Sequence, residues 1–248
     1  MTKRFAFIGA GSFGFTRNLV KDILTFPAFE DCEIALMDIN SERLKWIKQA
    51  CEKIVSMGNY PAKVTATTSR KEALKNANGI LCTILAGDIE IWKHDLLIPK
   101  KYGVDINIGD TRGPSGIFRA LRTIPVMLDI CRDIEMYASP NAVFLNYTNP
   151  MAMNCRAMQE KFPDMAVTGL CHSVQGTSHE LARMCGIPPE EVTYLSAGIN
   201  HQSWFLKFEW KGKDAYPLLW KAIKNKKNYM SDVVRIEMFK HLKYFVTE

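Results

Sequence analysis

Short β-rich runs alternate with helical patterns through the first 100 residues, and this alternation constrains the fold more than any other feature of the sequence. The expected strands cover residues 5–8, 33–37, 64–67 and 79–84, and the expected helices cover residues 16–24, 41–57 and 70–75. Ser41 is the expected cap of the second helix. Strands that alternate with helices indicate a parallel sheet with crossover connections. We therefore expect a doubly wound, Rossmann-like α/β sheet.

The alternation continues beyond Pro99 and changes character near residue 192. It predicts a loop at 107–115, helices at 116–137, 151–162 and 177–185, and strands at 142–145 and 165–168. The last of these helices should end at Gly186, which precedes two prolines. Two β-rich stretches at 192–197 and 203–210 and a helical segment at 232–244 follow. We expect a first domain at 1–195 and the beginning of a second, α+β domain at 196–248.

The composition excludes several classes of protein. With 47% hydrophobic and 23% charged residues, a chain of 248 residues can bury one full core and part of a second. It has no run of about eighteen apolar residues, and residues 1–9 lead into a strand pattern instead of a cleavable signal peptide. We expect a soluble cytoplasmic protein without a membrane partner.

The cysteines and the charges bear on redox chemistry and on partners. The seven cysteines show no paired spacing, which is typical of reduced, mostly buried thiols in a cytosolic chain. The net charge is +6, but the basic residues are spread out. Their densest group, Lys221, Lys224, Lys226 and Lys227, has no accompanying aromatic residues or binding motif. We interpret it as a solvated surface and expect no nucleic-acid partner.

A glycine-rich turn joins the first expected strand to the first expected helix. Residues 9–14, Gly-Ala-Gly-Ser-Phe-Gly, match the G-x-G-x-x-G pattern of dinucleotide-binding proteins. In that pattern Gly9 permits the tight turn, Gly11 lets the backbone approach a pyrophosphate, and Gly14 lets helix and strand pack. We assign Gly9, Gly11, Ser12, Phe13 and Gly14 to cofactor binding.

Asp38 completes the dinucleotide pattern at the end of the second expected strand. There its carboxylate can accept hydrogen bonds from the adenosine ribose hydroxyls, and it would repel a 2′-phosphate. NAD is therefore the expected cofactor. We include Arg43 among the cofactor-binding residues, although its charge could instead bind the 2′-phosphate of NADP. The alternative interpretation is that Asp38 serves only as a turn or cap residue.

Polar loops at 146–150, 169–174 and 198–202 follow expected strands, where ligands bind in open α/β sheets. We expect two of them to share the nicotinamide's cleft and the third to fold over it. Cys171 and His201 offer a thiolate and an imidazole, a pair suited to a divalent transition metal whose coordination substrate hydroxyls would complete. Their spacing alone also allows the alternative that Cys171 is an ordinary buried thiol and that His201 is a hydrogen-bonded histidine without a metal, since no four-ligand zinc pattern is present.

Taken together, these loops and the glycine turn resemble family 4 glycoside hydrolases across essentially all 248 residues. The similar blocks lie at residues 7–12, 35–39, 108–111, 113–114, 120–125 and 149–152. The block that indicates the substrate is Cys171-His172-Ser173-Val174, which is similar to the form found in the family's α-galactosidases. Residues 198–201, Gly-Ile-Asn-His, support the same placement.

The resemblance implies a role for each site residue. Cys171 and His201 would bind Mn²⁺, Asn149 would contact the sugar near the nicotinamide, and His172 would contact the substrate as the general acid. The phosphoglycosidases of the family carry aspartate or asparagine after the cysteine, whereas His172 stands here. Trp92 occupies the region where the phosphosugar branch has an arginine. The implied substrate is an unphosphorylated α-galactoside, and the implied assembly is a homodimer or homotetramer.

The implied chemistry is redox-neutral oxidation, elimination, addition and reduction with NAD and Mn²⁺. Hydride passes from C-3 of the sugar to NAD, and the resulting ketone acidifies the C-2 proton while the metal polarises the oxygens. The aglycone leaves with help from His172, water adds, and the ketone is reduced again. Coordination would deprotonate Cys171 and make the enzyme sensitive to oxidation.

Two alternatives stand beside this interpretation. An NAD-dependent dehydrogenase of a small hydroxy acid would share the fold and the glycine turn but would not need Cys171. A catalytically incomplete NAD-binding fragment would bind the cofactor without Mn²⁺-dependent turnover. The second alternative arises because family members continue beyond residues 245–248, and the continuation is expected to carry a tyrosine base and much of a dimer interface.

Overall fold

The computed structural model describes residues 2–105 and 109–247, which form two compact units, Met1–Leu170 and Cys171–Glu248. Asn107 and Ile108, which belong to an expected loop and to one of the family-like blocks, lie outside the described residues. The division after Leu170 differs from the boundary of 195/196 predicted from the sequence. The reason is packing, because α7 (Ser173–Cys185) contacts α8 (Tyr216–Ala222) and β7 (Val192–Ile199) of the second unit.

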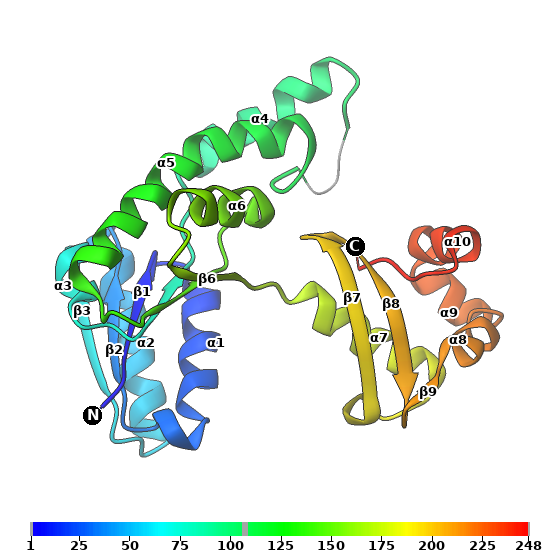
Figure 1. Ribbon diagram of the computed structural model, residues 1–248, viewed down its shortest axis with the longest axis horizontal. Coiled ribbons are helices and arrows are strands. Elements are labelled where there is room, and N and C mark those ends of the chain that lie inside the picture. Colours follow the sequence, from blue (N-terminus) through cyan, green and yellow to red (C-terminus); the bar gives the residue numbers. More distant parts are fainter. Residues whose placement is uncertain (1, 106–108, 248) are drawn as a thin grey trace. The chain divides into compact units, whose positions relative to one another are not determined.

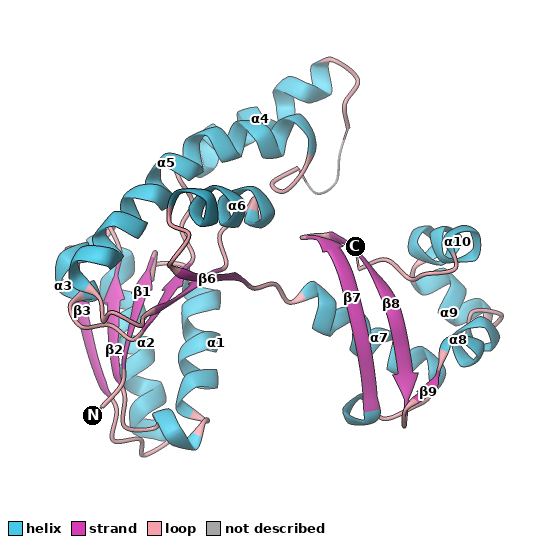
Figure 2. Cartoon of the chain, viewed as in Figure 1, coloured by secondary structure: helices cyan, strands magenta, loops and turns pink. Residues whose placement is uncertain are grey.

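The first unit is built on a six-stranded sheet in the order β3-β2-β1-β4-β5-β6. The strands are β1 (Arg4–Ile8), β2 (Glu33–Met37), β3 (Lys63–Thr67), β4 (Gly79–Cys82), β5 (Val143–Asn146) and β6 (Ala166–Gly169). Every neighbouring pair is parallel, and β1 lies between β2 and β4. Figures 1 and 2 show β1, β2 and β3 side by side in this sheet. This order has crossovers in both directions from β1, and it confirms the predicted Rossmann-like, doubly wound sheet.

The central strands are apolar on both faces because helices cover both sides of the sheet. Phe7, Ile34 and Leu36 pack with α1 (Phe13–Leu24) and α2 (Ser41–Met57) on one face. Their strand neighbours Ala6, Ile8, Ala35 and Met37 pack on the other face with α3 (Arg70–Leu74), α5 (Gly113–Tyr137) and α6 (Met151–Lys161). The period-two alternation of the strands thus supplies two cores.

Several helix boundaries differ from those predicted. Asn40, not Ser41, caps α2, since its Oδ1 atom accepts the Arg43 N–H at 2.9 Å. Helices α1, α5 and α7 begin before the predicted residues 16, 116 and 177. The sequence analysis missed α4 (Ile89–Lys101), which is capped by Asp88 through a 2.8 Å hydrogen bond from the Ile91 N–H. Helix α4 packs along α5 (Figure 1).

The second unit combines a small antiparallel sheet with four helices. Strands β7, β8 (Gln202–Trp210) and β9 (Lys213–Asp214) form the sheet, and α8, α9 (Lys226–Ser231) and α10 (Val233–Leu242) follow it. Phe205 and Phe208 of β8 are buried with Leu181 of α7 and Phe239 of α10. Gly186 ends α7 in the left-handed conformation, with φ of +68°, as predicted. Short 3-10 turns lie at Pro27–Phe29 and Pro189–Glu191.

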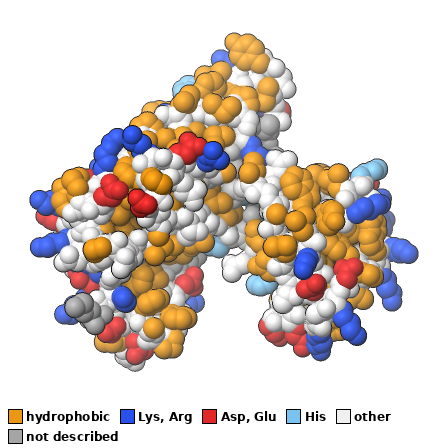
Figure 3. Space-filling model, in the orientation of Figure 1, with side chains coloured by type: hydrophobic (Ala, Val, Ile, Leu, Met, Phe, Trp, Pro, Cys, Tyr) orange, Lys and Arg blue, Asp and Glu red, His pale blue; other side chains and the backbone are white. Residues whose placement is uncertain are grey.

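Charged side chains of both signs are interspersed on the face drawn in Figure 3. Many are paired locally, as Lys48 is with Glu52 at 2.6 Å and Lys240 with Glu237 at 2.7 Å. Over the described part of the chain, no helix is both long enough and apolar enough to cross a membrane.

Candidate functional site

The glycine turn after β1 follows the predicted dinucleotide geometry at Gly9. Its φ is +84°, a conformation in which only glycine is unstrained. The N–H groups of Gly9 and Ala10 both donate to the Met37 carbonyl, at 3.0 and 2.9 Å, so the turn is anchored to the end of β2. A Cβ atom on Gly9 would lie 2.9 Å from the carbonyl carbon and oxygen of Thr83. Gly9 is therefore needed both for the turn and for close contact with the chain after β4.

Gly11 and Asp38 lie directly against each other. The Gly11 N–H donates to Asp38 Oδ2 at 2.7 Å, and a Cβ atom on Gly11 would lie 2.6 Å from that oxygen. The other carboxylate oxygen of Asp38 accepts the Asn40 N–H at 2.8 Å. Asp38 is thus a turn residue, as the alternative interpretation held, and it also stands beside the glycine turn as the dinucleotide pattern requires. Arg43 is exposed on α2 next to this pair.

Gly14 does not have the packing role predicted for it. A Cβ atom at this position would meet nothing within 4 Å, because the residue is exposed in the first turn of α1. Of the two glycines, Gly9 is the one in close contact, and its contact is with the chain after β4 at Thr83. Ser12 precedes α1 as its N-cap residue, and among the described residues its side chain makes no capping hydrogen bond. Phe13 is 47% exposed, so both residues are accessible at the amino end of α1.

The loops after β4 and β5 are tied together by buried polar groups. Thr148 Oγ1 accepts the Ile84 N–H at 3.0 Å, which joins the two loops. The side chain of Asn146 bonds both to the N–H of Thr148, at 2.9 Å, and to its carbonyl, at 3.1 Å. Asn154 donates to the same carbonyl at 3.0 Å. These contacts fix the residues immediately before Asn149 and its cis bond to Pro150.

Asn149 belongs to a polar cluster that the sequence analysis missed. Its Nδ2 atom donates to Asp110 Oδ2 at 2.8 Å, and the same oxygen lies 3.3 Å from the Arg119 guanidinium. Burial lowers the pKa of Arg119, and Asp110 counteracts this effect. The Arg119 guanidinium lies 5.7 Å from the centre of the Trp92 ring. The cluster comes from separate elements, so no local spacing could have predicted it.

Two hydrogen-bond donors in this cluster are buried without a partner among the described residues, Trp92 Nε1 and Arg119 Nε. Buried donors are normally satisfied, so such groups mark a place where an oxygen acceptor from outside the chain would be stabilised. The cluster of Trp92, Asp110, Arg119 and Asn149, which we call the Asp110 cluster, therefore has the character of a polar binding surface in the first unit.

In the second unit, the structure brings Cys171 and His201 together. Burial raises the pKa of the Cys171 thiol, but hydrogen bonds from the His201 side chain and from Ser173 outweigh burial, and the net pKa is lowered. Cys32, Cys51, Cys82, Cys131, Cys155 and Cys185 have raised pKa values, each mainly because of burial. Cys171 is thus set apart from the other thiols as the one stabilised in its thiolate form.

His201 and Cys171 are each presented by the end of a regular element. Ile199 pairs with Gln202, so Asn200 and His201 form the two-residue turn between β7 and β8. His201 has a φ of +58°, in the left-handed region, where asparagine, aspartate and histidine are enriched among the residues other than glycine. Cys171 lies just before α7, and the Ser173 N–H donates to its sulfur at 3.5 Å. The exposed His172 occupies the N-cap position of α7.

The donor set of this pair suits a divalent transition metal. A thiolate and an imidazole are both good ligands for such ions, and the lowered pKa favours the form of Cys171 that binds metal. Within residues 2–105 and 109–247, no group of three or more His, Cys, Asp or Glu side chains is arranged to hold an ion. An ion held by this pair would have further coordination positions for a substrate or water.

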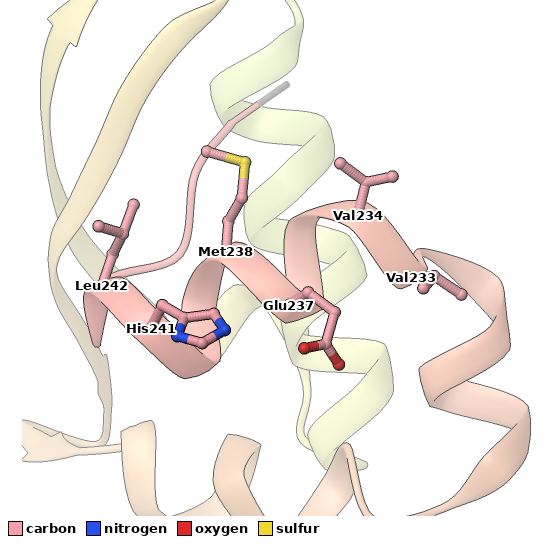
Figure 4. A pocket seen from close by; sticks show the side chains of 6 residues that line it. All are labelled: Val233, Val234, Glu237, Met238, His241 and Leu242. Carbon is pink, nitrogen blue, oxygen red and sulfur yellow. The ribbon is translucent and has the colours of Figure 1, made fainter.

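An open apolar hollow on α10 contains none of the predicted site residues. It is lined by Val233, Val234, Glu237, Met238, His241 and Leu242 (Figure 4). Most of these side chains are aliphatic, and the hollow lacks the convergent polar groups expected of a sugar site.

Comparison with known proteins identifies the family. Residues 4–187 match the model of the family 4 glycosyl hydrolases, and residues 196–248 match that of their C-terminal domain. The chain belongs to family 4 of the glycosyl hydrolases. The junction of the two matches lies close to the boundary of 195/196 expected from the sequence, whereas packing divides the family 4 chain after Leu170.

Among curated relatives of this family 4 chain, two are α-galactosidases. One from Rhizobium meliloti (strain 1021) is 44% identical over 85% of this chain and 43% of its own length. The other, from Bacillus subtilis (strain 168), is 39% identical over 99% of this chain and 57% of its own length. This chain thus spans about half the length of these relatives. Further relatives include an α-glucosidase from Erwinia rhapontici and an α-galacturonidase from Thermoanaerobacterium saccharolyticum, each 34% identical.

A solved structure of a 6-phospho-α-glucosidase from gut microorganisms, in complex with NAD and Mn²⁺, has the same fold. It superposes with a TM-score of 0.87 at 23% identity, and the match covers 100% of this chain and 59% of the other. Membership of a glycosidase family favours the glycosidase interpretation over the hydroxy-acid dehydrogenase considered from the sequence.

Proposed function

We propose that this chain provides the NAD-binding and metal-binding parts of an α-galactosidase that acts on unphosphorylated α-galactosides. The observation that carries the proposal is the hydrogen-bonded pair of Cys171 and His201, in which the pKa of the thiol is lowered. The two α-galactosidase relatives, at 44% and 39% identity, support galactose over the other sugars represented in the family.

NAD and Mn²⁺ are the proposed cofactors. The turn at Gly9 and Gly11, with Asp38 beside it, supports NAD because the carboxylate can bind ribose hydroxyls and would repel a 2′-phosphate. The accessible amino end of α1, which begins at Phe13, would offer backbone N–H groups of its first turn to a phosphate. Cys171 and His201 would hold the metal. A solved structure of a protein with the same fold is in complex with NAD and Mn²⁺, which supports this choice of cofactors.

The proposed chemistry is the redox-neutral sequence of oxidation, elimination, addition and reduction, for which NAD would accept and return hydride and Mn²⁺ would polarise sugar oxygens. His172, exposed before α7, would donate a proton to the leaving oxygen. Asn149, held by Asp110, would bind a sugar hydroxyl. The oligomeric state and the cytoplasmic location stay predictions.

Release of p-nitrophenol from p-nitrophenyl α-galactoside tests the proposal directly. The 248-residue protein should be assayed with NAD, Mn²⁺ and a reducing agent, each present or omitted, and with the α-glucoside and the 6-phosphorylated galactoside as comparison substrates. We expect release that needs all three additions, favours the unphosphorylated galactoside and produces no net NADH absorbance.

Other outcomes would replace the proposal. Stoichiometric NADH formation would indicate a dehydrogenase, and preference for the 6-phosphate would indicate a phosphoglycosidase. NAD binding without turnover, restored when the chain is extended to the length of its α-galactosidase relatives, would instead agree with the proposal and would show that the base lies outside this chain.

A further inference from the structure

Thr247 lies between the two elements that carry Cys171 and His201. It is fully buried, and its N–H donates to the Ser203 carbonyl at 2.8 Å, at the start of β8. Its own carbonyl accepts the Thr177 hydroxyl of α7 at 3.0 Å. Val246 forms a β-bridge with Trp204, so the segment 245–247 lies along β8. Thr247 therefore bonds to β8 at Ser203, two residues after His201. It also bonds to α7, the helix that follows Cys171.

Hydroxyl groups extend this connection to the other side of the β7–β8 hairpin. Thr247 Oγ1 accepts the Ser203 N–H at 3.2 Å and lies 3.2 Å from the Ser203 hydroxyl. Ser203 Oγ in turn accepts the Ser196 hydroxyl at 3.0 Å. Ser203 is paired with Gly198, close to the turn that contains His201, and Ser196 lies two residues before Gly198 on β7, so the bond between the two serines runs diagonally across the hairpin. The row of three hydroxyls thus joins both strands of the hairpin to the segment 245–247.

Arg235 of α10 holds the other end of the connection. Its guanidinium donates to the Thr247 carbonyl at 2.7 Å and to Thr177 Oγ1 at 3.1 Å, and it is paired with Glu180 of α7 and with Asp232. Arg235 and its two acidic partners are all largely buried. A charged group with this many partners fixes the position of the groups that it binds.

We infer that Thr247 is a positioning residue that sets the separation of Cys171 and His201 by bonding α7 to β8. The inference rests on the proposed metal role of that pair. The turn alone does not set this separation, because it places only His201, whereas Cys171 lies outside the hairpin, just before α7. The hydroxyl of Thr247, which bonds to Ser203 of β8, can be removed without changing the shape of the side chain, whereas the bond to α7 is made by the Thr247 carbonyl.

Binding of Co²⁺ to the NAD-loaded protein provides the test, with the thiolate-to-cobalt absorption band as the readout. Thr247→Val removes the hydroxyl and keeps the branched shape, and we expect Co²⁺ to bind roughly ten-fold more weakly with a changed band. Thr247→Ser should restore binding to within about two-fold because it restores the hydroxyl. Thr193→Val is the matched control, since exposed Thr193 bonds only to Glu209 of the same hairpin in the described structure.

Thr177→Val gives an independent second test, since it cuts the bond to α7 and leaves Thr247 intact. It should weaken Co²⁺ binding in the same direction even if Thr247→Val does not fold. NAD affinity should be unchanged in every variant. A normal cobalt band in both Thr247→Val and Thr177→Val would overturn the positioning role of Thr247 and would leave the metal role of Cys171 and His201 unaffected. The unaltered protein should show a thiolate-to-cobalt band that Cys171→Ser removes. If it shows no such band, or if the band persists in Cys171→Ser, the metal role of Cys171 and His201 is wrong, and the role of Thr247 with it.

Discussion

The glycine turn of the first unit and the cysteine–histidine pair of the second are built in opposite ways. At Gly9 and Gly11 the important atoms belong to the backbone, and the residues are needed because they have no side chain. At Cys171 and His201 the important atoms belong to side chains, which different elements bring together from a distance in sequence. A site made of backbone is specified by local spacing, whereas a site made of side chains depends on tertiary structure.

The largest expected effect is on the side-chain site. Cys171→Ser removes the thiolate, and we expect Mn²⁺-dependent hydrolysis of the α-galactoside to fall by at least about 100-fold, because losing a direct ligand costs more than losing a supporting residue. Cys185→Ser is the control, as that thiol lies in the same unit but burial raises its pKa to about 11. Equal losses in the two variants would show that Cys171 matters only for folding.

The backbone site should be sensitive to a single methyl group. Gly9→Ala places a Cβ atom 2.9 Å from the Thr83 carbonyl at a φ of +84°, so we expect the free energy of unfolding to fall by about 1–3 kcal/mol and NAD binding to weaken. Gly14→Ala adds the same methyl group to open space in α1 and should be neutral or stabilising by up to about 1 kcal/mol. Thermal denaturation with and without NAD compares them. Equal destabilisation would contradict the difference between the two glycines.

Asp38→Asn tests the side chain that lies against the glycine turn at Gly11. The change keeps the size but weakens the hydrogen bonds from the N–H groups of Gly11 and Asn40 and removes the charge. We expect roughly ten-fold weaker NAD binding, consistent with the loss of about 1–2 kcal/mol from bonds to a charged group. NADP binding should weaken less or improve. A titration of both cofactors is the measurement, and unchanged discrimination would leave Asp38 as a turn residue only.

The smallest expected effect concerns the pH at which Cys171 reacts. Its pKa lies below the ordinary 9.0, so alkylation by iodoacetamide should begin at lower pH than for Cys155, whose pKa is raised. Because the folded-state pKa is the lower one, this group stabilises the fold fully above its unfolded pKa, and the contribution is lost as the pH falls through the folded value. His201→Ala should move alkylation to higher pH. Peptide mapping after alkylation would detect the shift, and identical profiles for the two thiols would argue against it.

The same contrast explains what the sequence predicted and what it did not. The bounds of β2 and α2 were predicted correctly, since a buried apolar run is followed by a helix with an amphipathic pattern. Helix α4 was missed, although Asp88 and Glu90 are an ordinary start signal and Pro99 lies only in its last turn. The Asp110 cluster lay beyond sequence reasoning, because Trp92, Arg119 and Asn149 are far apart in the sequence and are brought together by tertiary structure.

The bonds of Thr148 to the loops after β4 and β5 have a consequence for the entropy of binding. A loop that must become ordered around a ligand loses conformational entropy at that moment, which weakens affinity by about 1–2 kcal/mol for each residue fixed. Here the buried side chains of Asn146 and Asn154 fix the backbone of Thr148 during folding, before any ligand arrives. The residue that follows, Asn149, is thus presented on a frame that is already ordered. Binding energy from a sugar at that position can then go into orienting the ring instead of ordering the protein.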